Sequence, residues 1–251
     1  MDKKDVISVL RNKIRTIEAE ECDIHVVGPI QLPIELDGQT KMFQWYSWLR
    51  KEKSEGEAGK GDTVEQIIDR LNTIHYAEMQ QSSVLVYGDF EHEAEAMIRM
   101  HSICHTGDIF GSQRCDCGFQ LKQSLRMITE HGTGALFYLA NHEGRGIGLF
   151  SKAMAYLLQE EGLDTVEANV ELGFADDARN YDEAIAVLRL LREAPVSLIT
   201  NNPRKVEAMR NAGMNIKNRI ALWGEATVYN EKYLSTKVAK SGHYDRMLAG
   251  K

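Results

Sequence analysis

The first eighty residues show two different patterns of apolar and polar positions. Over residues 4–20 apolar side chains recur every three to four positions, which predicts an amphipathic helix. Between residues 24 and 48 the chain is instead rich in β-branched and aromatic residues, which predicts strands with a turn at Asp37-Gly38. Residues 51–62 are charged and glycine-rich, so we expect a solvated loop there.

A capping pair and then a regular alternation of elements follow. Thr63 and Gln66 have the spacing of a capping box, which predicts a helix that reaches about Tyr76. Beyond it, short apolar runs predict strands over residues 84–87, 135–139, 196–199 and 216–222. Helical spacing predicts helices over residues 121–132, 147–161, 181–192 and 203–213. This alternation favours an α/β (α+β) fold, a mixed sheet layered with helices.

The composition narrows the class of protein. With 251 residues, of which 43% are hydrophobic, the chain can bury one substantial core. Its longest apolar runs are too short to span a membrane, and no apolar segment of the signal-peptide type opens the sequence, so we expect a cytoplasmic protein. The formal net charge of −7 is spread without a basic stripe, which argues against nucleic-acid binding.

Three of the four cysteines lie within one polar, glycine-rich segment. Cys104 precedes Cys115 and Cys117, whereas Cys22 is far away in the sequence. Three thiolates can bind Zn²⁺ and leave a fourth tetrahedral position for water, so we interpret these cysteines as zinc ligands and expect hydrolysis. The alternative is a set of inert buried thiols, because free cysteine is often buried. A disulfide between Cys115 and Cys117 would be strained.

Two further segments have the composition of phosphate-binding loops. Residues 141–149 (Asn-His-Glu-Gly-Arg-Gly-Ile-Gly-Leu) follow a predicted strand and enter a predicted helix, where backbone N–H groups favour anions. Residues 200–205 (Thr-Asn-Asn-Pro-Arg-Lys) also lie between a strand and a helix, on the usual ligand side of a sheet. Each segment is equally consistent with a plain turn or an ordinary capped helix.

A pair of carboxylates and an arginine precede another predicted helix. Asp177 and Arg179 can act as a general base beside a catalytic arginine. They are also consistent with a structural role, in which Asp176 and Asp177 complement the helix N-terminus and Arg179 forms a surface ion pair. Local chemistry leaves both interpretations open.

Taken in order, these motifs resemble those of GTP cyclohydrolase II. The matching runs are Arg-Met-His-Ser-x-Cys-x-Thr-Gly-Asp (99–108), Arg-Cys-Asp-Cys-Gly-Phe-Gln-Leu (114–121), Glu-Gly-Arg-Gly-Ile-Gly-Leu (143–149), Asp-Thr-Val-Glu-Ala-Asn (164–169), Leu-Gly-Phe-x-x-Asp-x-Arg (172–179), Thr-Asn-Asn-Pro-x-Lys (200–205) and Asn-Glu-x-Tyr-Leu-x-Thr-Lys (230–237). They cover roughly residues 84–243, whereas the first eighty residues match poorly. We therefore expect a diverged N-terminal region over residues 1–80 and a zinc-dependent catalytic domain over residues 81–251.

The resemblance implies a reaction and a set of binding residues. Family members convert GTP and water to formate, pyrophosphate and 2,5-diamino-6-ribosylamino-4(3H)-pyrimidinone 5′-phosphate, the first step of riboflavin synthesis. Zn²⁺ on Cys104, Cys115 and Cys117 would activate the water, Mg²⁺ would accompany the triphosphate, and a homodimer is expected. The residues at the family's GTP-binding positions are Arg99, Met100, His101, Ser102, Gln120, Glu143, Gly144, Arg145, Thr165, Thr200 and Lys205.

Three residues match catalytic positions of the family. Asp177 matches the proposed proton acceptor, and Tyr156 matches a helix tyrosine that assists ring opening. Arg179 matches the proposed nucleophile at the α-phosphate. Because a guanidinium with a pKa above about 12 is a poor nucleophile, a bidentate clamp on the transition state explains an essential arginine equally well.

The chain departs from the family pattern beside the site. Ile103 stands where glutamate is usual, His105 where leucine is usual, and Asn141-His142 where arginine and glutamine are usual. These changes leave open a paralogue that stops at a formamidopyrimidine nucleotide or acts in another pathway. A non-catalytic protein that binds zinc and a nucleotide is the other alternative.

Overall fold

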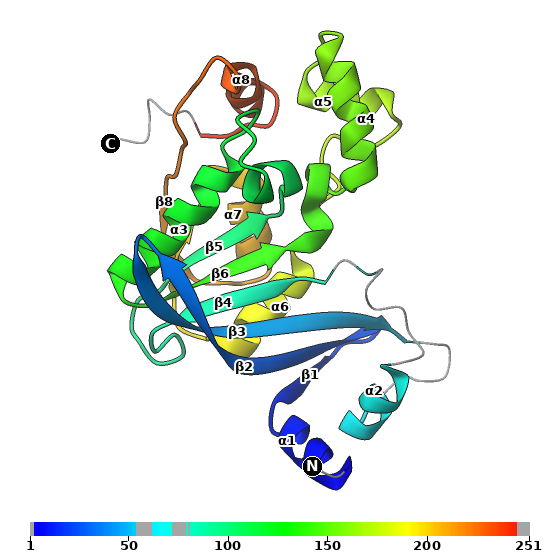
Figure 1. Ribbon diagram of the computed structural model, residues 1–251, viewed down its shortest axis with the longest axis vertical. Helices are drawn as coiled ribbons and strands as arrows, with labels where there is room; N and C mark the ends of the chain where they lie inside the picture. The colour runs from blue at the N-terminus through cyan, green and yellow to red at the C-terminus, as the bar shows by residue number, and fades with distance from the viewer. Residues whose placement is uncertain (1–2, 54–61, 72–78, 80, 245–251) are drawn as a thin grey trace.

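The computed structural model describes residues 3–53, 62–71, 79 and 81–244, which build one mixed sheet covered by helices (Figure 1). The strands are β1 (Ile14–Glu18), β2 (Cys22–Leu36), β3 (Gln39–Glu52), β4 (Ser83–Tyr87), β5 (Met97–Ser102), β6 (Gly134–Leu139), β7 (Val196–Ile199) and β8 (Ile216–Ile220). The helices are α1 (Lys3–Arg11), α2 (Val64–Arg70), α3 (Cys117–His131), α4 (Leu149–Glu160), α5 (Thr165–Glu171), α6 (Asp182–Leu191), α7 (Pro203–Asn211) and α8 (Glu231–Ala239). None of the described helices combines the length and apolar character needed to cross a membrane.

The sheet joins an antiparallel half to a parallel half. Its strand order is β1-β2-β3-β4-β6-β5-β7-β8, with antiparallel pairing from β1 through β4 to β6 and parallel pairing among β6, β5, β7 and β8. The predicted α/β class, a mixed sheet layered with helices, is confirmed. Because β3 pairs with β4, the sheet continues without a break from the N-terminal strands into the remainder of the chain.

The N-terminal pattern gave one correct and one wrong prediction. The long β2–β3 hairpin turns at Asp37 and Gly38, whose φ angles of 53° and 77° suit the tight turn of a right-twisted hairpin. The helix predicted over residues 4–20, however, ends at Arg11, and residues 14–18 form β1. Pairing of β1 with β2 outweighs the helical spacing of a few isoleucines, since β-branched residues also suit strands.

Most later elements agree with the predictions from the sequence. The capping box of Thr63 and Gln66 is present and opens α2, while residues 72–78 of the predicted helix lie outside the described residues. The predicted strands correspond to β4, β6, β7 and β8, and the predicted helices to α3, α4, α6 and α7. Besides β1, three of the described strands and α-helices had no counterpart in the predictions: β5, α5 and α8.

The hydrophobic core lies on both faces of the sheet. One cluster packs the sheet against α6 and α7 and includes residues from β2 and β3, such as Val26 and Trp48. The indole N–H of Trp48 also donates to Glu183 on α6 over 3.1 Å. The second cluster packs the other face against α3, through Leu125 and Ile128. A smaller cluster holds α4 against α5, the pair that projects from the sheet in Figure 1.

The parallel strands bring the sequence motifs to one end of the sheet. The cysteine segment follows β5, the glycine-rich segment follows β6, and residues 200–205 follow β7. Since β5 pairs in parallel with both β6 and β7, their carboxyl ends meet at the same edge. Ligand sites in such sheets form at the carboxyl ends of the strands, so the fold places the candidate residues together.

Candidate active site

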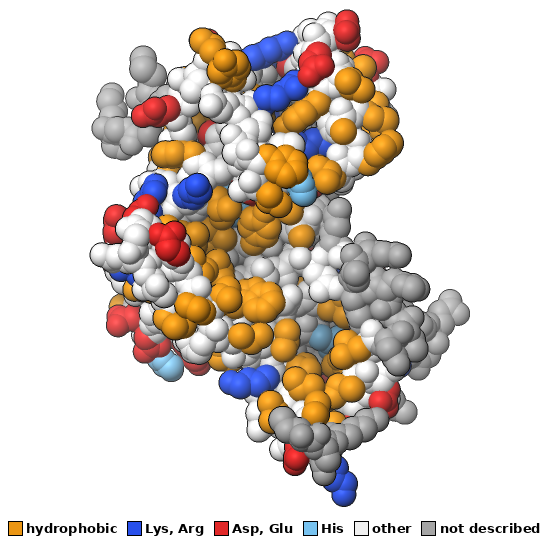
Figure 2. Space-filling model, viewed as in Figure 1, with side chains coloured by type: hydrophobic (Ala, Val, Ile, Leu, Met, Phe, Trp, Pro, Cys, Tyr) orange, Lys and Arg blue, Asp and Glu red, His pale blue; other side chains and the backbone are white. Residues whose placement is uncertain are grey.

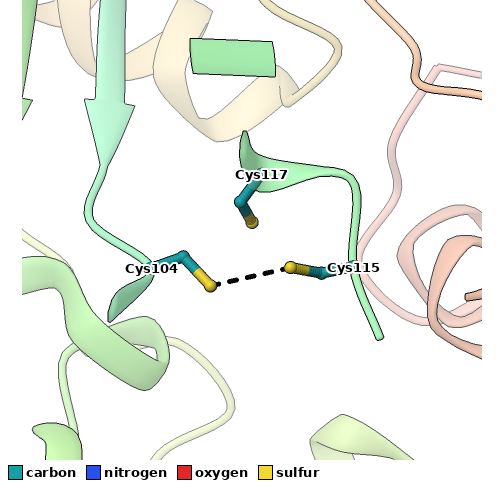
Figure 3. Close-up of side chains that lie close together, drawn as sticks. All are labelled: Cys104, Cys115 and Cys117. Carbon is teal, nitrogen blue, oxygen red and sulfur yellow. Dashed lines mark hydrogen bonds between the residues drawn. The ribbon is translucent and has the colours of Figure 1, made fainter. Parts of the chain in front are cut away.

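The three clustered cysteines converge at the carboxyl end of β5 and the first turn of α3. Their sulfur atoms lie within 4.8 Å of one another and point toward a common centre (Figure 3). The Sγ atoms of Cys104 and Cys115 are 3.6 Å apart. Tetrahedral zinc with Zn–S bonds of about 2.3 Å would place its sulfurs about 3.8 Å apart. The donor set and its spacing therefore fit zinc with one position left open.

A tight π-helical turn over His105–Ile109 shapes this cluster. A Cβ atom at Gly107 would lie 2.8 Å from the Sγ of Cys115 and 3.1 Å from the Sγ of Cys104, so only glycine leaves room for the sulfurs. The buried carboxylate of Asp108 accepts a hydrogen bond from the Cys104 N–H over 2.9 Å. It also accepts from the Tyr138 hydroxyl over 3.1 Å, which ties the turn to β6.

The three thiols affect one another because they are so close. Hydrogen bonds from Cys115 and Cys117 lower the pKa of Cys104. The reverse contact with Cys104, together with burial, raises the pKa of Cys115 to about 11. The same neighbours and burial raise the pKa of Cys117. Of the three sulfurs, Cys104 is therefore the one whose thiolate form its neighbours favour most.

A buried lysine from α4 lies against this thiolate. The Nζ of Lys152 is 3.2 Å from the Sγ of Cys104, 3.2 Å from the Oγ1 of Thr106 and 2.6 Å from the Oε1 of Glu143. Burial disfavours the ammonium, but Cys104 and Glu143 together raise the pKa of Lys152. The other oxygen of Glu143 accepts the His105 N–H over 2.7 Å. Glu143 thus joins the glycine-rich segment to the cysteine segment.

Asp177 and Arg179 form a partly buried, two-pronged ion pair. The Nε and Nη2 atoms of Arg179 lie 2.7 and 2.6 Å from the two carboxylate oxygens of Asp177. Burial alone would raise the pKa of Asp177, but the hydrogen bonds and charge of Arg179 lower it to about 2. Tyr181 and Asp177 raise the pKa of Arg179 against the effect of burial. The arginine is therefore a permanent cation at this position.

Further positive charges gather around Arg179. Lys205 is buried, and burial together with the charges of Arg99, Arg179 and Lys237 lowers its pKa. Its Nζ donates to the Met100 carbonyl over 2.6 Å. Arg99 donates to the Ile199 carbonyl over 3.0 Å and also to the side chain of Gln120. Such a concentration of buried cations is stable only when anions compensate it, so the arrangement suits an anionic ligand.

Comparison with known proteins agrees with this geometry. Residues 64–221 match the family model described as GTP cyclohydrolase II. The chain belongs to the GTP cyclohydrolase II family. It is 46% identical over 178 residues to GTP cyclohydrolase-2 of Histophilus somni strain 2336, which covers 70% of this chain and 82% of that protein.

Two other relatives extend this comparison. GTP cyclohydrolase-2 of Haemophilus influenzae strain KW20 is 49% identical over 161 residues, which are 64% of this chain and 74% of that protein. A riboflavin biosynthesis protein of Vibrio vulnificus is 48% identical over 174 residues, which are 69% of this chain and 47% of that protein. The resemblance noted in the sequence is confirmed, and with it the enzyme class, a hydrolase of the GTP cyclohydrolase II type.

One cavity brings together most residues predicted from the GTP cyclohydrolase II motifs. Its lining includes Arg99, His101, Ser102, Cys104, Cys115, Cys117, Gln120, Gly144, Arg145, Tyr156, Thr165, Arg179, Thr200 and Lys205. Three predicted residues lie behind this lining. Met100 contributes its carbonyl to Lys205, Glu143 pairs with Lys152, and Asp177 pairs with Arg179. The divergent residues Ile103 and His142 also line the cavity.

Several residues of the cavity were missed by sequence reasoning. Lys152 is the clearest example of a missed residue. Its position on the inner side of the predicted helix 147–161 was the feature of the sequence that could have indicated it. From α8, the Tyr233 hydroxyl lies 3.8 Å from the Sγ of Cys117, and Lys237 pairs with Asp116 over 2.7 Å. Burial and then the charge of Lys237 lower the pKa of His243 to about 3. Tyr233 and Lys237 belong to the last matching run, to which no role had been assigned, and His243 follows α8.

Proposed function

We propose that this protein opens the guanine imidazole ring of GTP with zinc and water. The products would be formate, pyrophosphate and 2,5-diamino-6-ribosylamino-4(3H)-pyrimidinone 5′-phosphate, the first intermediate of riboflavin synthesis. The observation that carries the proposal is the shared cavity of a three-cysteine cluster and a buried group of cations. A zinc-binding donor set and an anion-binding wall in one cavity suit hydrolysis of a nucleotide triphosphate.

The cysteines would hold the metal, and their neighbours would keep the cluster in shape. Bound to Cys104, Cys115 and Cys117, zinc supplies an activated water at its fourth position. Lys152 offsets the negative charge of the thiolates, and Asp108 fixes the backbone of Cys104. The cluster would therefore be built before substrate arrives.

Arg179 would act as an electrostatic clamp on the phosphates. Its raised pKa keeps the guanidinium charged, which favours a hydrogen-bonding clamp over nucleophilic attack. Lys205, Arg145 and Thr200 line the same cavity and would bind further phosphate oxygens, with Mg²⁺ accompanying the triphosphate. The remaining predicted substrate contacts on the cavity wall are Arg99, His101, Ser102, Gln120, Gly144 and Thr165, while Met100 and Glu143 would act from behind the wall through Lys205 and Lys152.

Asp177 would accept a proton only after its partner is drawn away. With a pKa of about 2 it is a weak base while Arg179 holds both oxygens. When phosphate oxygens compete for the Arg179 side chain, the carboxylate loses part of its stabilisation and its pKa rises, while Arg204 remains 3.3 Å from one of its oxygens. Tyr156, whose hydroxyl is 3.3 Å from the Oγ1 of Thr106, would donate a hydrogen bond during ring opening.

Incubation of the zinc-loaded protein with GTP and Mg²⁺ tests the proposal directly. Formate, pyrophosphate and product mass are measured together. Equal amounts of formate and pyrophosphate support the full reaction. Pyrophosphate with a product that keeps the formyl carbon would replace it with the truncated reaction of a paralogue. Bound zinc and GTP without turnover would instead indicate a non-catalytic protein.

Two cysteine variants separate the metal site from general effects of thiol loss. Cys115→Ser removes a proposed ligand, and we expect loss of both zinc and formate release. Cys22→Ser is the matched control, because this buried thiol lies on β2 outside the cluster. Zinc content at the wild-type level in Cys115→Ser would overturn the ligand assignment.

We further propose that the protein forms a homodimer through the apolar surface near the active site. Figure 2 shows hydrophobic side chains gathered over the α4–α5 region. On α4, Phe150 is 78% exposed and Leu157 64% exposed. A mass in light scattering of twice the 28.4 kDa chain would support the dimer. Phe150→Glu should then give monomers, whereas Val9→Glu on the exposed side of α1 should not.

A further inference from the structure

A histidine without a role in the proposed reaction is enclosed beside the cavity. His142 follows β6 and is 2% exposed. Its Nε2 lies 2.7 Å from the carbonyl oxygen of Asn180, and its Nδ1 lies 3.1 Å from the Oγ of Ser102. A carbonyl oxygen can only accept, so Nε2 must carry a hydrogen. Burial lowers the pKa of His142 to about 3, which leaves Nδ1 free to accept from the Ser102 hydroxyl.

This hydrogen-bonding pattern continues to the arginine of the ion pair. With its own hydrogen directed at His142, Ser102 presents a lone pair to Arg179, whose Nη1 lies 3.3 Å from Oγ. Arg179 therefore donates to Ser102, and Ser102 donates to His142. The ring of Tyr181 packs edge-on against His142, with centroids 4.9 Å apart, and limits rotation of the imidazole.

Arg179 needs such support because of where it lies in the chain. Residues 174–181 have no helix or strand, so the backbone around Arg179 is not held by a regular element. His142 reaches this segment by two routes. It donates directly to the carbonyl of Asn180, the next residue in sequence, and it accepts from Ser102, which in turn accepts from Arg179. One side chain thus supports both the backbone beside Arg179 and the guanidinium nitrogen that faces Ser102, while Asp177 holds the other two nitrogens.

We infer that His142 is a positioning residue that sets the orientation of Arg179 toward the phosphates through Ser102 and Asn180. The inference rests on the proposed role of Arg179 as a clamp. It requires a side chain that donates at one end and accepts at the other. The amide of glutamine can both donate and accept, whereas leucine can do neither. Asparagine can do both but is too short to span the two partners.

The experiment compares His142→Gln, His142→Leu and His142→Asn with the wild type in the GTP assay. We expect His142→Gln to keep kcat within about threefold. The other two variants should lose about 10- to 100-fold in kcat with little change in KM, because misplacement of a clamp by about 1 Å has effects of this size. Zinc content and far-UV circular dichroism control for folding, and asparagine is the polar substitute if leucine is not accommodated.

A second measurement does not depend on turnover. In ¹⁵N NMR of the metal-loaded protein, the Nη1–H signal of Arg179, whose nitrogen donates to Ser102, should be sharp and slow to exchange in the wild type and in His142→Gln. This signal should broaden or disappear in His142→Asn. An unchanged Arg179 signal, or a fall in kcat below threefold, would overturn the inference. If the wild type fails to convert GTP, the proposed function fails, while the NMR result still decides whether His142 positions Arg179.

Discussion

Replacement of Gly107 by alanine tests whether the cysteine cluster is built around a metal. The added methyl group would lie 2.8 Å from the Sγ of Cys115, 3.1 Å from the Sγ of Cys104 and 3.2 Å from the Cβ of Cys117. Comfortable contacts between such atoms are about 3.5–4.0 Å. The sulfur of Cys115 would therefore have to move by roughly 0.7–1.2 Å, and that of Cys104 by roughly 0.4–0.9 Å.

These displacements exceed what a zinc site accepts. Ligand distances in such sites hold to within about 0.2 Å, so at least one thiolate would leave the coordination sphere. Changes outside the ligand set already weaken metal binding by about 10- to 100-fold, and displacing a ligand should have a larger effect. We expect the zinc affinity of Gly107→Ala to fall by more than about 100-fold.

Competition with a chromogenic chelator measures this affinity. Gly111→Asn is the control, because Gly111 is in the same segment with φ of 68° and open space around its Cβ position, and asparagine tolerates that conformation. The control should bind zinc within about threefold of the wild type. Wild-type affinity in Gly107→Ala, with unchanged circular dichroism, would refute the geometric argument.

Three further predictions concern buried polar contacts. Lys152→Met leaves the buried carboxylate of Glu143 without its cation and should lower the free energy of unfolding by about 3–5 kcal/mol. The double variant with Glu143→Gln should recover most of this loss. Additive losses of the two substitutions in urea unfolding would contradict the coupling. The low pKa of Asp177 implies that its pair with Arg179 adds about 2 kcal/mol above pH 4 and that this gain disappears as the pH falls toward 2. The stability difference between wild type and Asp177→Asn should shrink over that window, and a constant difference would be evidence against the shift. Tyr156→Phe should reduce formate release by about 100-fold with zinc content unchanged, and an unchanged rate would exclude a role for the hydroxyl.

Much of the site could be predicted because its residues follow strands. The segments 141–149 and 200–205 each come directly after an apolar run, and parallel strands end at a common edge. Spacing in the sequence therefore translated into proximity in space. The two interpretations of Asp177 and Arg179 could not be separated in this way. The choice between the two interpretations depends on how far the pair is shielded from solvent, and neighbouring elements of the fold provide that shielding.

The elements and residues that the sequence did not predict share a different physical cause, since they depend on contacts between distant parts of the chain. The run Met97–Ser102 mixes apolar, basic and polar residues and carries little strand signal, yet β6 and β7 enclose it on both sides. Lys152 is buried because a thiolate and a carboxylate from two other segments surround its ammonium group. Residues 14–18 are a strand because β2 offers them a partner. Local periodicity contains none of this information.

The pairing of β3 with β4 bears on how the chain can be shortened. Between Gln44–Ser47 and Ser83–Val86 the two strands share a ladder, and Trp48 anchors β3 to α6. In a fragment without the first eighty residues, β4 and its valines would form an exposed edge strand with unpaired backbone N–H and C=O groups. Exposed edge strands pair with strands of other molecules and lead to aggregation. The N-terminal strands thus cover an edge of the sheet that would otherwise be open to other chains, and we expect a fragment beginning at residue 81 to express as insoluble protein.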